Sequence, residues 1–174
     1  MSLYEAKALI DWNTLIRAHG SAVFGIAWRI LGHAEDAEDV VQEVFAEAHR
    51  QSNGMEVECW AALLCRMATC RALDALRRRR IAMPLEADQI IAAKDVPEEK
   101  LAARELEARL RSAIKELPHR DAEVFCLRYF ENLSHRQIAE TLEISATAAS
   151  TALSRARSRL EILLGVPKKE SRHE

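Results

Sequence analysis

The feature that most constrains this chain is the spacing of its apolar residues, which recur every three or four positions in both halves of the sequence. One such stripe consists of Ala37, Val40, Val41, Val44, Phe45 and Ala48. This period places apolar side chains on one face of an α-helix, whereas a half-buried strand would alternate. The apolar set is mostly Ala and Leu, and only 5% of the 174 residues are aromatic, so composition also favours helix. The sequence therefore predicts an all-α protein.

The first half is predicted to form three or four helices. Apolar spacing from residue 9 to 31 ends at Gly32, a residue that commonly terminates helices. A second helix is expected from Ala34, followed by a turn over residues 51–54. A third helix is expected from Trp60 to Arg80, with its apolar residues at helical spacing.

Residues 81–100 contain Pro84, Pro97, several acids and little periodicity, which is typical of a linker. We therefore expect two small helical domains, residues 8–81 and 101–165. A flexible linker over residues 82–100 would join them.

The second half contains a short helix and a longer one separated by a tight turn. Ser134 and Gln137 have the spacing of a capping box, and Ser145 is suited to cap a last helix from Ala146 to Leu164. That helix would bury Ala149, Leu153, Ala156 and Leu160 and expose Thr147, Ser150, Thr151, Ser154, Arg155, Arg157 and Ser158. Small, polar and basic residues on an outer face suit the DNA major groove, so the pair indicates a helix-turn-helix. The alternative is an ordinary amphipathic surface helix.

Charge is distributed unevenly although the net charge is only −2. Residues 35–47 carry six acids and no basic residue, whereas residues 66–80 carry six arginines and one acid, Asp74. The arginines suit phosphates, although those at residues 77–80 could simply complement a helix C-terminus. The acidic segment would repel DNA and suggests a basic protein partner; a metal site from Asp36, Asp39 and Glu43 is the weaker alternative.

Other sequence features exclude several classes of protein. The four cysteines, Cys59, Cys65, Cys70 and Cys126, form no CxxC pair and are expected to be core thiols. A redox or zinc switch built from the first three and a histidine is disfavoured, because helical spacing puts them on different faces. No cofactor or metal is expected. No apolar run approaches the roughly 20 residues of a membrane span and no signal peptide is seen, so we expect a cytoplasmic protein.

Three segments resemble a known family. Residues 36–45, DAEDVVQEVF, resemble the DAEDxxQExF signature of extracytoplasmic-function sigma factors, and residues 60–78 are similar to the family's FxxWLxxIAxNxxxDxLRR. Leu63 stands there for the usual Trp, and Cys70 for the usual Asn. Residues 117–140 are similar to LPxxxRxVFxLRYxExLSYxEIAE. The last helix departs from the family, with Ala148, Ala149, Ser150 and Ala152 where a threonine, a valine, a lysine and an arginine are common.

The resemblance implies a sigma region 2 bundle followed by a region 4 helix-turn-helix, and a sigma factor rather than an enzyme. It assigns core RNA polymerase binding to Asp36, Asp39, Gln42 and Glu43. It assigns minus-10 DNA binding to Arg66, Cys70, Arg71, Asp74, Arg77 and Arg78, with the loop of residues 51–59 capturing an unstacked base. It assigns minus-35 DNA binding to Arg136, Gln137, Thr147, Ser150, Thr151, Ser154, Arg155 and Arg157. The expected partners are core polymerase, through its clamp and flap, promoter DNA and an anti-sigma factor.

Two other functions compete with this one. A free-standing helix-turn-helix regulator would share the C-terminal half, but it leaves the acidic helix unexplained. An all-α enzyme using Asp36, Asp39 or His33 would need a recognisable catalytic motif. The sequence has no nucleophile elbow, phosphate loop or HExxH pair.

Overall fold

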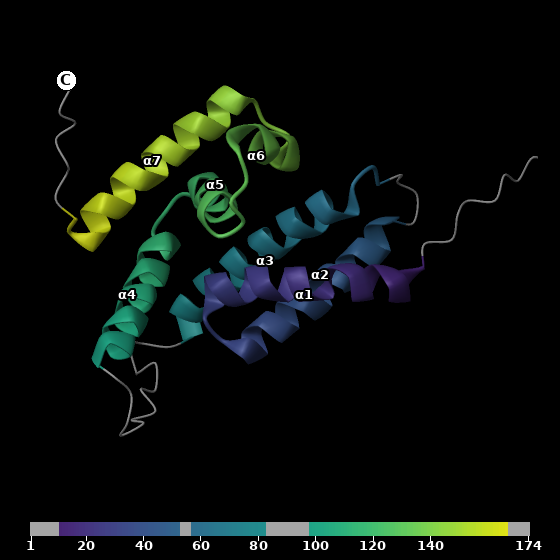
Figure 1. Ribbon diagram of the computed structural model, residues 1–174, viewed down its shortest axis with the longest axis horizontal. Coiled ribbons are helices and arrows are strands. Elements are labelled where there is room, and N and C mark those ends of the chain that lie inside the picture. The colour runs from purple at the N-terminus through teal and green to yellow at the C-terminus, as the bar shows by residue number, and fades with distance from the viewer. Residues whose placement is uncertain (1–10, 53–56, 83–97, 167–174) are drawn as a thin grey trace, which may run out of the picture.

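The computed structural model describes residues 11–52, 57–82 and 98–166. Within these ranges the chain forms seven helices and no strand, which confirms the all-α prediction (Figure 1). The helices are α1 (Trp12–Leu31), α2 (Ala34–Ser52), α3 (Trp60–Ala82), α4 (Glu98–Lys115), α5 (His119–Tyr129), α6 (His135–Leu142) and α7 (Ala146–Leu164).

Helices α1, α2 and α3 pack against one another as a three-helix unit. Asp11 caps α1 by accepting hydrogen bonds from the backbone N–H groups of Asn13 and Thr14 at 3.1 and 3.3 Å. The helix ends at Gly32, which has a φ of 75° and a backbone N–H that donates to the Trp28 carbonyl. The stop predicted at this glycine is confirmed, because the left-handed conformation favours a residue without Cβ.

Helices α4 to α7 form the C-terminal half, in which α5 and α6 pack on α7. The N-caps of α6 and α7 are Ser134 and Ser145, as predicted, and both bonds of the Ser134–Gln137 capping box are present. The expected inner face of α7 is buried, since Ala149, Leu153, Ala156 and Leu160 are each at most 5% exposed. The short helix, tight turn and long helix of a helix-turn-helix are therefore formed.

The predicted turn over residues 51–54 is wrong in its first two positions. Helix α2 continues through Ser52, which is buried and donates its hydroxyl to the His49 carbonyl at 2.9 Å. Residues 53–56 lie outside the described residues, as do residues 83–97 of the expected linker. Helix α3 extends to Ala82 and α4 begins at Glu98, so both helices reach slightly further than expected. The division into domains at 8–81 and 101–165 stays a prediction.

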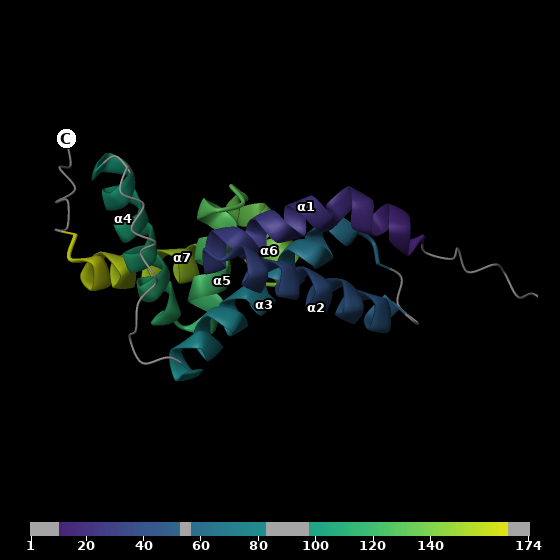
Figure 2. The same ribbon diagram turned by 90° about the horizontal axis from the view of Figure 1, so that it is seen from below.

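Helix α3 lies at the centre of the molecule and is covered on two sides. One side packs on α1 and α2, and the other contacts α5, α6 and the end of α4 (Figures 1 and 2). The two halves of the chain therefore meet along α3. Among the described residues, no helix combines the length and the apolar character needed to cross a membrane.

Candidate nucleic-acid interface

The residues predicted to bind a protein partner lie together on the outer face of α2. The buried residues of this helix are Ala37, Val40, Val44, Phe45, Ala48 and Ser52, which turns Asp36, Asp39, Gln42 and Glu43 outward. We call these four residues the acidic stripe. Two of its members also contact the end of α3: Asp36 lies 3.3 Å from Arg79, and Glu43 lies 4.0 Å from Arg78. The acidic and basic segments of the sequence are therefore neighbours in space.

The six residues predicted to bind the minus-10 element do not share one face of α3. Arg66, Cys70 and Arg77 are four and seven residues apart, which places them on one side of the helix, toward α5 and α6. We call these three residues the inner stripe. Arg71 and Arg78 lie on another side, where they pair with Glu47 and Glu43 of α2. Asp74 is half-buried between the two sides.

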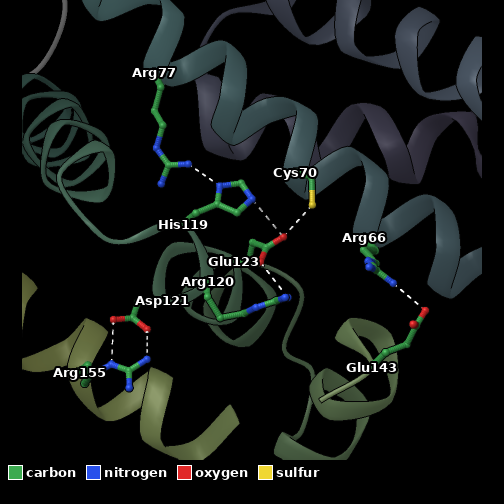
Figure 3. A network of polar contacts seen from close by, with 9 residues as sticks. All are labelled: Arg66, Cys70, Arg77, His119, Arg120, Asp121, Glu123, Glu143 and Arg155. Atoms are coloured by element: carbon green, nitrogen blue, oxygen red, sulfur yellow. Dashed lines mark hydrogen bonds and ion pairs between the residues drawn. The ribbon is translucent and has the colours of Figure 1, made fainter. Parts of the chain in front are cut away.

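Each residue of the inner stripe is bound by the C-terminal half (Figure 3). Arg66 donates to Glu143 at 2.7 Å, and the thiol of Cys70 donates to Glu123 Oε1 at 2.7 Å. Arg77 donates to the Leu117 carbonyl at 3.1 Å and also contacts His119 Nδ1. The structure therefore brings together three of the predicted residues and occupies their polar groups.

Glu123 is the centre of this polar network. Its side chain is only 4% exposed, and a buried carboxylate needs cations or hydrogen-bond donors around it. It lies 3.1 Å from Arg120 and 3.5 Å from His119 Nε2, in addition to its bond with Cys70 (Figure 3). Burial, followed by the hydrogen bond to Glu123, raises the pKa of the Cys70 thiol to about 12. This thiol is therefore protonated at neutral pH.

The donor atoms of Cys70, His119 and Glu123 lie within 4.8 Å of one another, which is the spacing of a candidate metal site. Each donor is already engaged, however. The thiol donates to the carboxylate, Arg77 contacts Nδ1 of the histidine, and the Arg120 guanidinium pairs with Glu123. A metal cation would have to displace these contacts and lie among arginines. We interpret the cluster as a hydrogen-bonded network, and only Cys70 of the three thiols considered for a zinc or redox switch belongs to it.

The other cysteines differ in their surroundings. Cys126 is fully buried in α5, and burial raises the pKa of its thiol. Cys65 is half-buried, and burial raises its pKa to about 12. Cys59 is exposed at the start of α3. The interpretation as a core thiol therefore fits Cys126 best and does not fit Cys59.

The predicted outer face of α7 is exposed, but several of its side chains have internal partners. Arg155 donates two hydrogen bonds to Asp121 of α5, at 2.7 and 3.1 Å, and the hydroxyl of Thr151 donates to the Thr147 carbonyl at 2.8 Å. The guanidinium of Arg157 lies 6.0 Å from the centre of the Tyr129 ring. Thr147, Ser150 and Ser154 are exposed on the same face.

Helix α6 carries the other two predicted minus-35 residues. Arg136 is highly exposed and pairs with Glu140 one turn later at 2.9 Å. The amide oxygen of Gln137 accepts from the Ser134 backbone N–H at 2.9 Å, so this side chain caps the helix. Gln137 lies in the first helix of the helix-turn-helix, as expected. Its amide oxygen is already used in the cap of that helix.

Sequence reasoning missed the residues that bind these groups: Glu47, His119, Asp121, Glu123 and Glu143. Only Glu123 carried a signal. It interrupts an apolar run, Ala122 to Leu127, at a position that helical spacing places inside the protein. The others are surface-type residues whose partners lie far away in the sequence.

Comparisons with known proteins agree with the two-part organisation. The family model of Sigma-70 region 2 matches residues 15–81, and that of Sigma-70, region 4 matches residues 107–160. The chain is 31% identical over 160 residues to ECF RNA polymerase sigma factor SigE of Mycolicibacterium smegmatis, covering 90% of this chain and 62% of that relative. It is 26% identical over 158 residues to ECF RNA polymerase sigma factor SigW of Bacillus subtilis, covering 84% of each. The chain thus spans less than two thirds of the length of the mycobacterial relative.

Two solved structures share the fold. One is CnrH in complex with the cytosolic domain of CnrY, with a TM-score of 0.60, 24% identity, and coverage of 90% of this chain and 89% of that one. The other is the sigma factor RpoE in complex with the anti-sigma factor NepR from Bartonella quintana, with a TM-score of 0.56, 19% identity, and coverage of 91% and 99%. Both sigma-70 regions match in order, and the similar relatives are ECF sigma factors. The chain therefore belongs to the sigma-70 family of RNA polymerase sigma factors, in its extracytoplasmic-function group.

Proposed function

We propose that this protein binds core RNA polymerase in the cytoplasm and directs it to promoters by recognising minus-10 and minus-35 elements, without being an enzyme itself. The observation that carries the proposal is the presence of both sigma-70 regions in one chain. A protein that must contact two promoter elements on one polymerase needs two DNA-binding units, and this chain has two.

The acidic stripe is the proposed contact with the polymerase clamp. Asp39, Gln42 and Glu43 are exposed on α2, and the carboxylates of Asp39 and Glu43 give this face a negative charge that DNA would repel. A basic protein surface is the complementary partner. Helix α2 also belongs to the unit that carries α3, so the same domain would bind polymerase and DNA.

The DNA contacts are proposed on α3 for the minus-10 element and on α6 and α7 for the minus-35 element. The arginines of α3 suit the phosphate backbone of a melted DNA strand. A base of that single strand can be held in a protein pocket. Within the loop of residues 51–59 that is expected to hold that base, residues 53–56 lie outside the described residues. The exposed Thr147, Ser150 and Ser154 let the backbone of α7 approach a major groove closely.

Two further protein contacts belong to the proposal. The C-terminal half would contact the polymerase flap, and an anti-sigma factor would restrain the free protein. Support for the second comes from the two solved structures of the same fold, each determined with a bound partner, one of which is named an anti-sigma factor.

Binding to core polymerase separates this proposal from a free-standing regulator. The double substitution Asp39→Arg with Glu43→Arg should abolish co-purification with core polymerase while leaving the helical content unchanged, because both side chains point to solvent. Glu105→Arg with Glu161→Arg makes the same change of charge on the C-terminal half and is the matched control. Retained polymerase binding by a folded Asp39→Arg/Glu43→Arg variant would remove the acidic stripe from the interface and favour the regulator.

A further inference from the structure

The N-terminal half of α7 has an unusually uniform outer surface. No residue from Ala146 to Ser154 carries a charge or a side-chain amide. The exposed residues of this stretch are Ala146, Thr147, Ala148, Ser150, Thr151 and Ser154. We call these residues the neutral face. It presents only methyl groups and hydroxyl groups to whatever meets this end of the helix.

Discrimination among bases in the major groove depends on which side chains reach the base edges. Arginine and lysine recognise guanine, asparagine and glutamine recognise adenine, and the acidic residues accept from cytosine. None of these residue types occurs in the neutral face. Serine and threonine hydroxyls bond to any base, whereas a side-chain methyl group contacts the methyl group of thymine. Methyl contacts are therefore the selective chemistry that the neutral face can offer.

The two threonines of the neutral face are well placed for such contacts. The hydroxyl of Thr151 donates to the Thr147 carbonyl at 2.8 Å, so its proton is used within the helix and its methyl group is what it can offer a base. Thr147 lies one turn earlier on the same side of the helix, and Ala148 is exposed next to it. All three lie in the first two turns of α7, and the N-terminal residues of a recognition helix are those that contact base edges.

The first arginine of α7 lies away from that end. Arg155 follows Ala146 by nine residues, which is about 14 Å along the helix at 1.5 Å per residue. Its Nε and Nη2 atoms donate to the buried carboxylate of Asp121 at 3.1 and 2.7 Å (Figure 3). This edge of the guanidinium is therefore committed to α5 and is not available to guanine.

Helix α6 supplies no selective group in place of the missing ones. In a helix-turn-helix the first helix crosses the phosphate backbone. Arg136 is highly exposed there, and the amide oxygen of Gln137 is used in the helix cap. Arg136 therefore suits a phosphate contact, which positions the protein but carries no sequence information.

We propose that this protein recognises its minus-35 element through the methyl groups of thymines, which Thr147, Ala148 and Thr151 contact in the major groove, and that it requires no guanine there. Arg155 is a positioning residue that holds α7 on α5. The inference rests on the proposed function, because that function places α7 on duplex DNA. It adds which base α7 selects and which side chains select it.

Selection from a random pool of duplex DNA by the free, full-length protein identifies the preferred element. We expect the selected sequences to share thymines at their most constrained positions and to have no required guanine. Each of these thymines is then replaced in turn by deoxyuridine, which removes only the methyl group. The affinity measured by fluorescence anisotropy should fall about threefold to fourfold at each contacted thymine, which is what the burial of one methyl group supplies.

The variants Thr147→Ser and Thr151→Ser test the protein side of the same contacts, because each removes a methyl group and keeps the hydroxyl. Each should bind the duplex that contains thymine about threefold to fourfold more weakly than the wild type does. Neither should lose further affinity when the thymine that it contacts is replaced by deoxyuridine, since the contact is already absent. Thr14→Ser, at an exposed threonine of α1, is the matched control and should bind as the wild type does.

Three results would overturn the proposal. A required guanine would contradict it directly, and equal affinity for the thymine and deoxyuridine duplexes would mean that any preference for A·T pairs reflects DNA shape. Losses from the threonine variants and from deoxyuridine that simply add would remove these methyl groups from the contact. A pool without enriched sequences would show that α7 selects no base. Co-purification with core polymerase tests the acidic stripe and not these contacts, so failure of the proposed function is recognised separately.

Discussion

Arg155 shows how one side chain can serve two purposes. It lies on the exposed face of α7, where the sequence predicted a DNA contact, yet both of its hydrogen bonds go to the buried carboxylate of Asp121. The hydrogen bond to Asp121 also raises the pKa of the Arg155 guanidinium. The residue therefore holds α7 against α5, whether or not it also meets DNA.

Replacing Arg155 with Ala should accordingly lower the melting temperature, because it leaves the Asp121 carboxylate buried without its cation. Arg157→Ala is the matched control, since it removes a guanidinium of the same helix that has no carboxylate partner among the described contacts. Thermal denaturation followed by circular dichroism compares the two. Equal melting temperatures would mean that the Asp121 pair contributes nothing to folding, and Arg155 would return to being a DNA contact alone.

Gly32 is required by backbone geometry and by a neighbour from the other half of the chain. Its φ of 75° is strained for any residue with a side chain, and a Cβ there would lie 2.6 Å from the guanidinium carbon of Arg111. Gly32→Ala should lower the free energy of unfolding by about 1–2 kcal/mol from the left-handed conformation alone.

Gly165 provides the comparison for Gly32. It has a φ of 68° at the end of α7, with no atom within 4 Å of the Cβ position. Urea denaturation should therefore show a larger loss of unfolding free energy for Gly32→Ala than for Gly165→Ala. If the two losses were equal, contact with Arg111 would play no part.

The buried thiols predict how stability depends on pH. Burial raises the pKa of Cys65 to about 12, from an ordinary value of 9.0, so the folded chain keeps a proton that the unfolded chain releases. This contribution to stability is complete below about pH 9 and is lost as the pH rises from 9 toward 12. The melting temperature should fall between pH 8 and pH 10.5, and Cys65→Ala should reduce that fall. Cys59→Ala, at an exposed position, should not change it; an identical slope in all three proteins would contradict the assignment.

At the scale of elements, the helix boundaries follow from local chemistry. The capping box at Ser134 joins residues three positions apart, so it forms wherever α6 forms. Ser134→Ala should lower the free energy of unfolding by about 1 kcal/mol. Ser158→Ala, at an exposed position in the interior of α7, should cost nothing because Ala favours helix. A neutral Ser134→Ala in chemical denaturation would show that α6 is held by packing alone.

Local chemistry also explains which parts of the fold were predictable from sequence. Gly32, Ser134 and Ser145 act within one turn of themselves, and their predicted roles are confirmed. The end of α2 was misplaced because Ser52 was interpreted as a turn residue, whereas its hydroxyl bonds back to the His49 carbonyl and its side chain is buried. Burial depends on how other helices pack on α2, which the local pattern does not encode.

The arrangement of the site was less predictable for the same reason. The sequence correctly placed the acidic stripe on the outer face of α2, because a helical period suffices for that. The family resemblance assigned six residues of α3 to the minus-10 element, but their contacts place them on different sides of that helix. Arg66 meets Glu143, which is 77 residues away, while Arg71 meets Glu47 of α2. No spacing rule reports contacts at such separations.

At the scale of the whole molecule, the chain consists of two units. The first carries the acidic stripe and the arginine-bearing helix α3, and the second ends in a helix-turn-helix. Helices of the second unit contact α3 of the first, and most of the acidic stripe is exposed to solvent. Under the proposed function, polymerase binding and DNA binding would therefore use different surfaces. The net charge of −2 is compatible with the proposed function, in which polymerase would supply much of the affinity for DNA.

Run-off transcription with purified core polymerase and a library of promoter fragments tests this account most directly. We predict that core polymerase alone gives no defined transcripts, that adding this protein yields transcripts from a subset of fragments sharing two elements upstream of the start, and that Asp39→Arg/Glu43→Arg abolishes them. Transcripts that do not depend on the protein, or that the double substitution leaves unchanged, would contradict the claim that this chain directs polymerase to promoters through its acidic stripe.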